Sequence, residues 1–315
     1  MSLLRLFLQR IALGVIAAWA VLTAVFAMFT MTDDWVLGGI VGNLRFAQAD
    51  EEEIEAARQQ YLAERGLDRP LYEQYFDWMS DMLTLNWGNS LASGEPAFET
   101  VTGALLRTAM YVVPATVLAI LFGITIGLYI ALNPESRLAE SSRIGAYLLF
   151  AIPSFWIGGL IFSFTMNEGR MEYSPWLFEH ALPIAFVFAA LLGGYVSYSR
   201  AHSLEYASAE FVTLVRAKGA GPLRIARHVM RNAAIPFFSM LFTEALALLV
   251  LAVFVIEILF GIEGFGLVLF EGINERDLPI ILGGTLYIVA FGILGNILQD
   301  LSYTSLDPRV DTGSR

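Results

Sequence analysis

The chain has 315 residues, of which 57% are hydrophobic and 16% are charged, and its mean hydropathy is +0.62. This apolar content exceeds what the core of one soluble domain needs, so it excludes an ordinary soluble protein and indicates a membrane protein. The formal net charge is −11 and cysteine is absent, which excludes a disulfide framework, a thiol nucleophile and a cysteine metal site.

Apolar runs of about 20 residues recur along the chain, and a helix of this length crosses a hydrocarbon core of about 30 Å. Because such helices satisfy their own backbone hydrogen bonds, we predict an all-α polytopic membrane protein with six transmembrane helices. The predicted spans are residues 11–31, 108–132, 144–166, 182–198, 233–260 and 279–301. The first run is also compatible with a signal peptide, but it is longer than the core of about 7 to 15 residues that such a peptide has.

Three parts of the chain follow from these spans. Residues 1–31 hold the N-terminus and the first span, residues 32–107 form a long extracytoplasmic segment, and residues 108–315 form a five-helix core. Within the long segment, residues 49–64 begin with acids that favour a helix N-terminus, and they place Ile54, Ala57 and Tyr61 on one face. The stretch after Pro70 predicts a second amphipathic helix. We expect this segment to meet whatever delivers a solute, and a passive cover is the alternative.

The distribution of charge predicts how the chain is threaded. With cytoplasmic N- and C-termini, the inner segments hold twelve of the 19 basic residues and seven of the 30 acids. An excess of arginine and lysine in short cytoplasmic loops is what the positive-inside rule requires. The opposite threading would place six basic residues in one short external loop. We therefore expect a multi-pass protein of the plasma membrane with both termini in the cytoplasm.

The inner loop 200–231 carries the most informative local pattern. Residues 210–218 predict a short helix, and Pro222 predicts the start of another, with the glycine pair around Ala220 as the bend between them. The spacing of the second helix places Leu223, Ala226 and Met230 on one face. Its other face carries Arg224, Arg227, His228 and Arg231. Such a basic unit is suited either to a cytosolic partner or only to anionic lipid.

The sequence has no means of handling nucleotides by itself. It contains no G-x-x-x-x-G-K-[ST] phosphate loop, and its three histidines show no metal-ligand spacing. We therefore expect no catalytic residue, no metal and no cofactor, and any ATP must be hydrolysed by a partner. Apart from the inner loop, the sequence has no basic cluster that would indicate nucleic-acid binding.

Short groups of residues occur in a characteristic order along most of the chain. In the loop they are Arg200, Ser203, Leu204, Glu205, Glu210, Phe211, Val212, Arg216, Ala217, Lys218, Gly219, His228, Arg231, Asn232, Ala233 and Pro236. Elsewhere they are residues 66–71, 74–75, 87–90, 114–116, 153–156, 182–183, 257, 260–261, 264–266, 276–277, 279 and 306–309. Together these groups resemble the permeases of ABC importers in the dipeptide, oligopeptide and nickel family, in particular the first of their two permease subunits.

The resemblance implies a type I ABC importer permease architecture. It implies that loop 200–231 is the loop that couples to the ATPases, with Glu205, Glu210, Arg216, Ala217, Lys218, Gly219, His228, Asn232 and Pro236 as its site residues. It also implies a heterodimer with a second homologous permease, two cytosolic ABC ATPases, and an extracytoplasmic solute-binding protein that delivers peptides or related small solutes. The glutamate that many such permeases carry six residues before the loop glycine is Thr213 here.

Two acids fall inside the fifth predicted span. An ionised side chain at mid-span costs about 2 to 4 kcal/mol unless it faces water or a partner. Glu244 is therefore a candidate for the translocation path, with a structural hydrogen bond as the alternative. Glu257 lies near the end of the span, where we expect it to brace the turn at residues 261–266.

Two other functions are compatible with a polytopic protein. One is an ATP-independent secondary transporter or channel, although such folds often show inverted repeats that this sequence lacks. The other is a non-transporting membrane scaffold that recruits proteins through residues 32–107. The loop pattern favours the importer permease over both.

Overall fold

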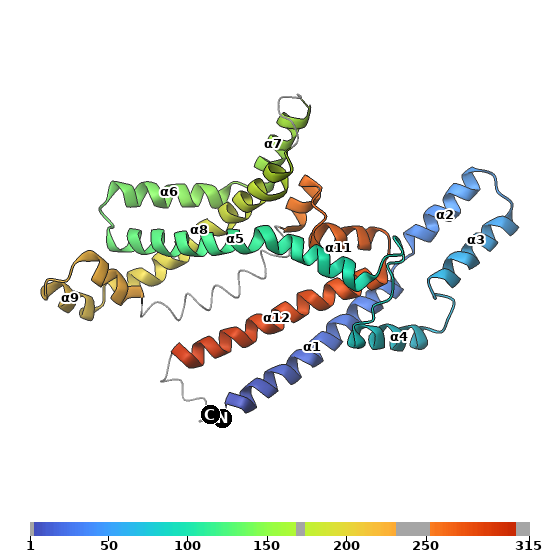
Figure 1. The fold of residues 1–315 in the computed structure, drawn as a ribbon, viewed down its shortest axis with the longest axis horizontal. Helices are drawn as coiled ribbons and strands as arrows, with labels where there is room; N and C mark the ends of the chain where they lie inside the picture. The colour runs from blue at the N-terminus through green and yellow to red at the C-terminus, as the bar shows by residue number, and fades with distance from the viewer. Residues whose placement is uncertain (1–2, 168–173, 231–252, 307–315) are drawn as a thin grey trace. The chain divides into compact units, whose positions relative to one another are not determined.

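A computed structural model describes residues 3–167, 174–230 and 253–306 of the chain (Figure 1). The regular elements in these ranges are helices. They are α1 (Leu3–Met31), α2 (Trp35–Phe46), α3 (Glu51–Glu64), α4 (Leu71–Thr84), α5 (Ala97–Leu132), α6 (Arg137–Ala151), α7 (Ser154–Asn167), the π-helical turn η1 (Trp176–Ala181), α8 (Leu182–Ala207), α9 (Glu210–Ala217), α11 (Phe265–Asn274) and α12 (Leu278–Leu306). Residues 222–230 and Val253–Phe260 are helical as well. The predicted all-α class is confirmed.

Four stretches within the described ranges are long and apolar enough to cross a membrane. They are Phe7–Phe46, Ala97–Leu132, Trp176–Ala207 and Leu278–Asp300, and a fifth results if Val253–Phe260 and Phe265–Asn274 are counted as one bent span. The four contain the spans predicted at 11–31, 108–132 and 182–198, and all but the last residue of the span predicted at 279–301. Most of the span predicted at 233–260 lies outside the described residues. The polytopic helical architecture is confirmed.

The span predicted at 144–166 is not one continuous helix. α6 ends at Ala151, Ile152 is extended with ψ of 121°, and α7 begins at Ser154. Pro153 causes the break, because proline lacks a backbone N–H and disfavours the helical conformation of the residue before it. The prediction of a single helix was therefore wrong at this point.

Two helices extend beyond their predicted ends. α5 begins at Ala97 rather than at residue 108, and α8 continues through Ala207 into the predicted inner loop. In both helices the added turns are more polar than the span, so they contribute little to a hydropathy signal. The extra turns of α8 lead directly to α9.

The chain forms two compact units. One consists of Met1–Phe7, Arg107–Ile262 and Leu294–Arg315, and the other of Leu8–Leu106 and Glu263–Ile293. Each unit has a buried core of its own.

In the first unit, α5 and α8 approach closely at small residues. A Cβ atom on Gly127 would lie 2.6 Å from the carbonyl oxygen of Val196, so only glycine fits there. Ser199 then donates a hydrogen bond of 3.0 Å to the carbonyl of Ile124. Gly123 and Gly127 are spaced by four residues, the pattern that lets membrane helices pack with their backbones close together.

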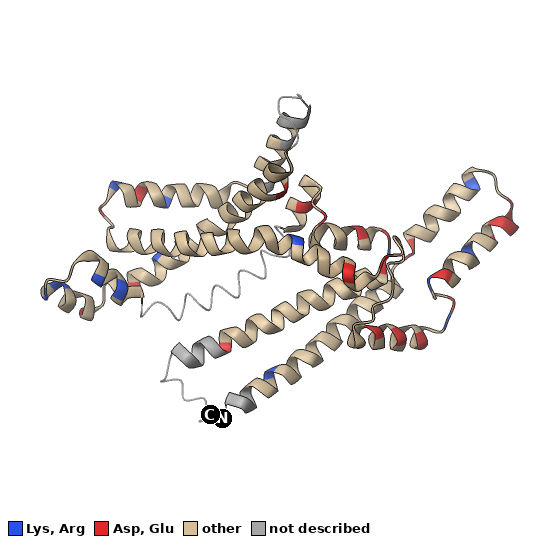
Figure 2. Cartoon of the chain, viewed as in Figure 1, with Lys and Arg blue, Asp and Glu red and all other residues tan. Residues whose placement is uncertain are grey.

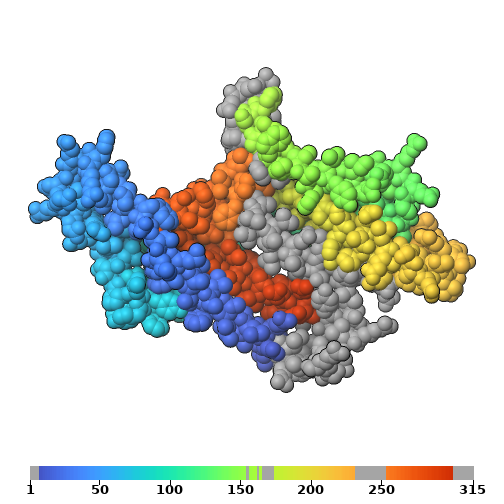
Figure 3. Space-filling model, turned by 180° about the vertical axis from the view of Figure 1, so that it is seen from behind, coloured from blue at the N-terminus to red at the C-terminus, as the bar shows by residue number. Residues whose placement is uncertain are grey.

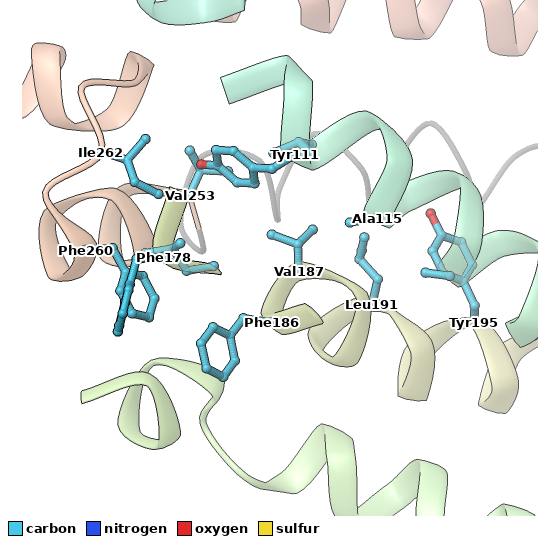
Figure 4. Close-up of a cluster of buried hydrophobic side chains, with 13 residues drawn as sticks. Tyr111, Ala115, Phe178, Phe186, Val187, Leu191, Tyr195, Val253, Phe260 and Ile262 are labelled. Atoms are coloured by element: carbon cyan, nitrogen blue, oxygen red, sulfur yellow. The ribbon is translucent and has the colours of Figure 1, made fainter. Parts of the chain in front are cut away.

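The core of the first unit surrounds this α5–α8 contact (Figure 4). It contains Tyr111, Val112, Ala115 and Ala119 from α5, Phe186, Val187, Leu191 and Tyr195 from α8, and Phe178, Val253, Ile256, Phe260 and Ile262. The rings of Phe186 and Phe260 stack with centroids 5.8 Å apart. The helix Val253–Phe260 is thereby fixed against α8.

In the second unit, α1 packs against α4 and the first half of α12. The buried residues are Leu22, Phe26, Met79, Met82, Trp87, Ala97, Val101, Leu278, Ile280 and Leu282. The Trp87 ring lies directly over the backbone of Gly283, where a side chain would collide with it. Trp87 also contacts Phe98 and Tyr287 edge to face.

Three helices lie between α1 and α5. The predicted helix at 49–64 is confirmed as α3, which Asp50 caps by accepting a hydrogen bond from the Glu53 amide, and Ile54 and Tyr61 form its buried face. The second predicted helix is confirmed as α4. α2 was not predicted, although Asp34 is a helix-capping residue and accepts hydrogen bonds from the amides of Val36 and Leu37.

Candidate functional site

The predicted inner loop folds as two helices joined by a glycine turn. α9 ends at Ala217, Gly219 adopts φ of +77°, and the second helix begins at Pro222. A residue with a Cβ atom is strained at such a φ, whereas glycine is not. We call α9, the turn 218–221 and the helix 222–230 the α9 hairpin.

The α9 hairpin is fixed to α5 by a small apolar core. Val212, Ile225 and Val229 are buried together with Leu128 of α5. Leu132, Tyr206, Phe211, Val215, Ala220, Ala226 and Met230 pack around them. Because its two helices share one core with α5, a force on the hairpin is transmitted to α5 and, through the short link after Ala207, to α8.

The apolar face of the second helix differs from the prediction at Leu223. Ile225 and Val229 are buried, Ala226 and Met230 are half-buried, and Leu223 is 85% exposed. The spacing that groups Leu223 with Ala226 and Met230 therefore does not make Leu223 part of the packed face. Leu223 lies in the first turn of the helix, beside the glycine turn.

The outer side of the α9 hairpin combines basic and apolar side chains. Figure 2 shows that lysine and arginine recur along the α9 hairpin. Arg216, Lys218, Arg224 and Arg227 are exposed, and the exposed Leu223 lies among them in the sequence. A surface with an uncovered leucine within a basic rim is typical of a docking site for another protein.

The structure places seven of the predicted loop residues. Glu205 lies on the last turns of α8, and Glu210 is the first residue of α9. Arg216, Ala217, Lys218 and Gly219 form the end of α9 and the start of the turn, and His228 lies on the second helix. All seven residues are exposed. Asn232 and Pro236 lie outside the described residues, as does Glu244, the candidate for the translocation path.

Sequence reasoning missed the anchoring residues of the hairpin. Val212 was noted only as part of a motif, and Ile225 and Val229 were not singled out, although these two are four residues apart and so lie on one helical face. The exposed Leu214 was missed as well. The sequence offers little indication of its exposure, because a single leucine between Thr213 and Val215 does not show which face of α9 is buried.

Glu257 is fully buried in the first unit. It accepts hydrogen bonds of 2.5 Å from Thr108 and 2.6 Å from Tyr111, both on α5. The backbone carbonyl of Glu257 also accepts the amide of Ile262, beside Gly261, which adopts φ of +64°. Glu257 thus joins α5 to the end of the helix Val253–Phe260, at the turn that it was expected to brace.

The second unit contains a polar cluster around Arg276. This buried side chain donates hydrogen bonds of 2.8 Å to the Phe29 carbonyl and 3.0 Å to the Asp33 carbonyl, and it lies 3.5 Å from the Asp34 carboxylate. Its guanidinium also lies over the rings of Phe29 and Trp35. The link between α11 and α12 is thereby tied to the link between α1 and α2.

Tyr61 and Asp277 extend this cluster to α3 and to the segment between α4 and α5. The Tyr61 hydroxyl donates to both oxygens of Asp34, at 3.1 and 3.0 Å. Burial, with the adjacent Asp34 carboxylate, raises the pKa of Tyr61 to about 12, although Arg65 opposes the change. Asp277 accepts a hydrogen bond of 2.5 Å from Ser90.

These features define the class of the protein as a polytopic α-helical membrane protein with a basic hairpin that follows α8 and packs on α5. Residues 123–312 match the family described as "Binding-protein-dependent transport system inner membrane component". The chain belongs to this family, and it is a permease subunit of an ABC importer, as the motifs in the loop implied. The family is a transport component and not a catalytic one.

Curated relatives match the chain over most of its length. The oligopeptide transport system permease protein AppB of Bacillus subtilis is 27% identical over 83% of this chain and 87% of its own. The dipeptide transport system permease protein DppB of the same organism is 27% identical over 93% and 95%. The metal-staphylopine import system permease protein CntB of Staphylococcus aureus is 26% identical over 79% and 81%.

Proposed function

We propose that this permease translocates peptides or related small solutes, driven by separate cytosolic ATPases that act on the α9 hairpin. The observation that carries the proposal is the hairpin itself, which exposes Leu223 among basic residues while Ile225 and Val229 fix it to α5. An element that is free on one side and rigidly packed on the other transmits motion from a partner. If the basic residues of the hairpin only set the orientation of the chain in the membrane or bound anionic lipid, the hairpin would not need this packed core.

The mechanism is a shift between two states of the permease. When the ATPases close on ATP, they displace the α9 hairpin, and its core with α5 moves the spans toward the outward-facing state. The ATP-bound ATPases bind the two states of the permease with different free energies, and this difference is the free energy available for the shift. The chain contains no phosphate loop, which supports ATP hydrolysis in another subunit.

The proposal includes an orientation and further partners. Both termini and the α9 hairpin lie in the cytoplasm, because the inner segments hold the excess of basic residues. A second homologous permease completes the path, and an extracytoplasmic solute-binding protein meets residues 32–107. The names of the relatives AppB and DppB support oligopeptides or dipeptides as the solute, and the name of CntB supports a metal chelate.

The test is transport by the complex that co-purifies with the full chain, reconstituted in liposomes. ATP should drive uptake of a labelled dipeptide, oligopeptide or metal chelate, and the complex should contain a second permease and ATPases with phosphate loops. Uptake by the single purified chain without ATP would overturn the proposal.

The role of the hairpin is tested by Gly219→Val in the same preparation. Valine at φ of +77° strains the turn, although nothing lies within 4 Å of the new Cβ atom, so the turn changes shape without crowding a neighbour. We expect ATP hydrolysis to persist and uptake to fall several-fold. Gly221→Ala is the matched control, because this glycine lacks a positive φ and also has open space around it. Unchanged uptake in Gly219→Val would remove the hairpin from the mechanism.

A further inference from the structure

α4 carries two apolar faces, only one of which is covered by the described chain. Met79 and Met82 are buried against α1. Tyr72, Phe76 and Leu83 are 64, 66 and 81% exposed. We call these three residues the outer stripe of α4.

The outer stripe and the acids of α4 occupy different sectors of the helix. At about 100° per residue, Tyr72, Phe76 and Leu83 lie within about 40° of one another. Glu73, Asp77 and Asp81 follow on the far side, centred about 120° from the stripe. The face against α1, with Met79 and Met82, is centred about 70° away in the other direction. α4 therefore has one side for α1, one for an apolar environment and one for water.

Hydrogen bonds fix the depth of α4 along the spanning helix α1. The Trp19 indole donates a hydrogen bond of 2.9 Å to the Tyr75 hydroxyl, and the Thr23 hydroxyl forms a hydrogen bond of 2.8 Å with the same oxygen. α1 has 29 residues and is about 43 Å long, whereas the hydrocarbon core is about 30 Å thick. At 1.5 Å per residue, Thr23 lies at a boundary of the core when residues 3–23 form the span, as an interfacial α4 requires, and nearer the middle when residues 11–31 do. Tyr75 and the helix that carries it cannot lie far from the lipid.

The outer stripe also continues an exposed apolar surface of α1. Trp19 is 57% exposed, and its indole bonds the tyrosine that precedes Phe76. The Tyr75 and Phe76 rings meet edge to face at 5.5 Å. Figure 3 shows α4, in cyan, beside α1, in dark blue, with its outer side uncovered. Amphipathic helices with this partition of faces lie in the plane of a membrane interface.

We propose that α4 is an interfacial helix, with Tyr72, Phe76 and Leu83 inserted at the boundary between lipid headgroups and acyl chains. The lipid, rather than a protein partner, covers the outer stripe, because the stripe is continuous with exposed apolar side chains of a membrane-spanning helix. Asp77 points to water, and its exposed ion pair with Arg69 at 2.5 Å remains on the water side. The segment before α5 is thus anchored to the membrane surface and not only to α1.

The absence of cysteine makes a direct test of depth practicable. Single cysteines at Phe76, Leu83 and Asp77 are labelled with a nitroxide in the full chain, together with its co-purified subunits, in phosphatidylcholine liposomes. The accessibility of each label is measured to oxygen, which concentrates in lipid, and to a neutral nickel chelate, which stays in water. Asp77→Cys is the matched control, because it lies on the same turn of α4 as Phe76 but in the acidic sector.

The expected result is an oxygen-to-nickel accessibility ratio several-fold higher at positions 76 and 83 than at 77. Equal ratios at all three positions would place the stripe in water and overturn the proposal. Immobilised labels at 76 and 83 that neither reagent reaches would also overturn it, because a permease or a binding protein would then cover the stripe. All three positions are exposed, so the substitutions leave the packed face of α4 intact.

Discussion

The hydroxyl of Tyr111 on α5 donates a hydrogen bond of 2.6 Å to the buried carboxylate of Glu257. Thr108, one turn earlier, donates a second bond to the same oxygen. Two hydroxyl groups of one helix thus hold the end of another at the point where the chain turns at Gly261. This contact explains why an acid is tolerated in an otherwise apolar stretch.

The first prediction concerns this contact. Tyr111→Phe removes one donor without changing the ring, so we expect the permease to lose about 1 kcal/mol of stability, typical of a hydrogen bond between membrane helices. The midpoint of thermal unfolding in detergent measures the loss. Tyr147→Phe, on the exposed side of α6, is the control and should leave the midpoint unchanged. An equal effect of both substitutions would show that the bond to Glu257 contributes nothing.

A second prediction concerns the cluster at Arg276. Arg276→Lys keeps the charge but loses the planar group that reaches Phe29 and Asp33 together. We expect a loss of about 3 kcal/mol, because the remaining buried groups are left without partners. Chymotrypsin should then cleave within residues 32–107 sooner than in the wild type. Arg58→Lys on the exposed side of α3 should not change the cleavage rate, and resistance of the Arg276 variant would contradict the assigned role.

A third prediction is a pH dependence that Tyr61 confers. The pKa of this phenol is raised from 10.0 to about 12 in the folded chain, so the fold favours the neutral form. Its contribution to stability is complete below pH 10 and is lost as the pH rises from about 10 through 12. Above pH 10, the wild type should therefore lose stability more steeply than Tyr61→Phe. Parallel unfolding profiles for the two proteins between pH 8 and 12 would contradict the assignment.

Much of the fold could be predicted from local sequence pattern, and the failures have physical causes. The helix start at Pro222 and the bend at Gly219 were visible because proline and glycine restrict or free the backbone locally. The break at Pro153 followed from the same chemistry but was hidden in a long apolar run. Leu223 has the spacing of the apolar face but is exposed, because periodicity gives the spacing of a face and not which of its residues are buried.

The polar clusters could not be predicted in the same way. Arg276 and Asp277 were recognised as a motif, but their partners Phe29 and Ser90 are far away in the sequence. Glu257 likewise finds Tyr111 only after α5 and the helix Val253–Phe260 have packed. Long-range contacts of this kind leave no periodic signal in one sequence.

A fourth prediction separates docking from stability within the α9 hairpin. Leu223→Ala removes an exposed side chain, so we expect the midpoint of thermal unfolding to remain unchanged. Because Leu223 belongs to the proposed docking surface, ATP-driven uptake should fall several-fold. Ile225→Ala creates a cavity in the hairpin core and should cost about 2 kcal/mol or more. The first variant is the control for the second. A loss of stability in Leu223→Ala without a loss of uptake would reverse the two assignments.

The most direct test of the whole account is a photo-crosslink from position 223. Leu223→Cys would be the only cysteine in the chain, and it can carry a benzophenone in the complex purified from its native membrane. The account predicts a crosslink to a subunit with a phosphate loop, and the yield should change when ATP is added. A crosslink to lipid alone, or labelling of position 223 only from the extracytoplasmic side of intact cells, would contradict it.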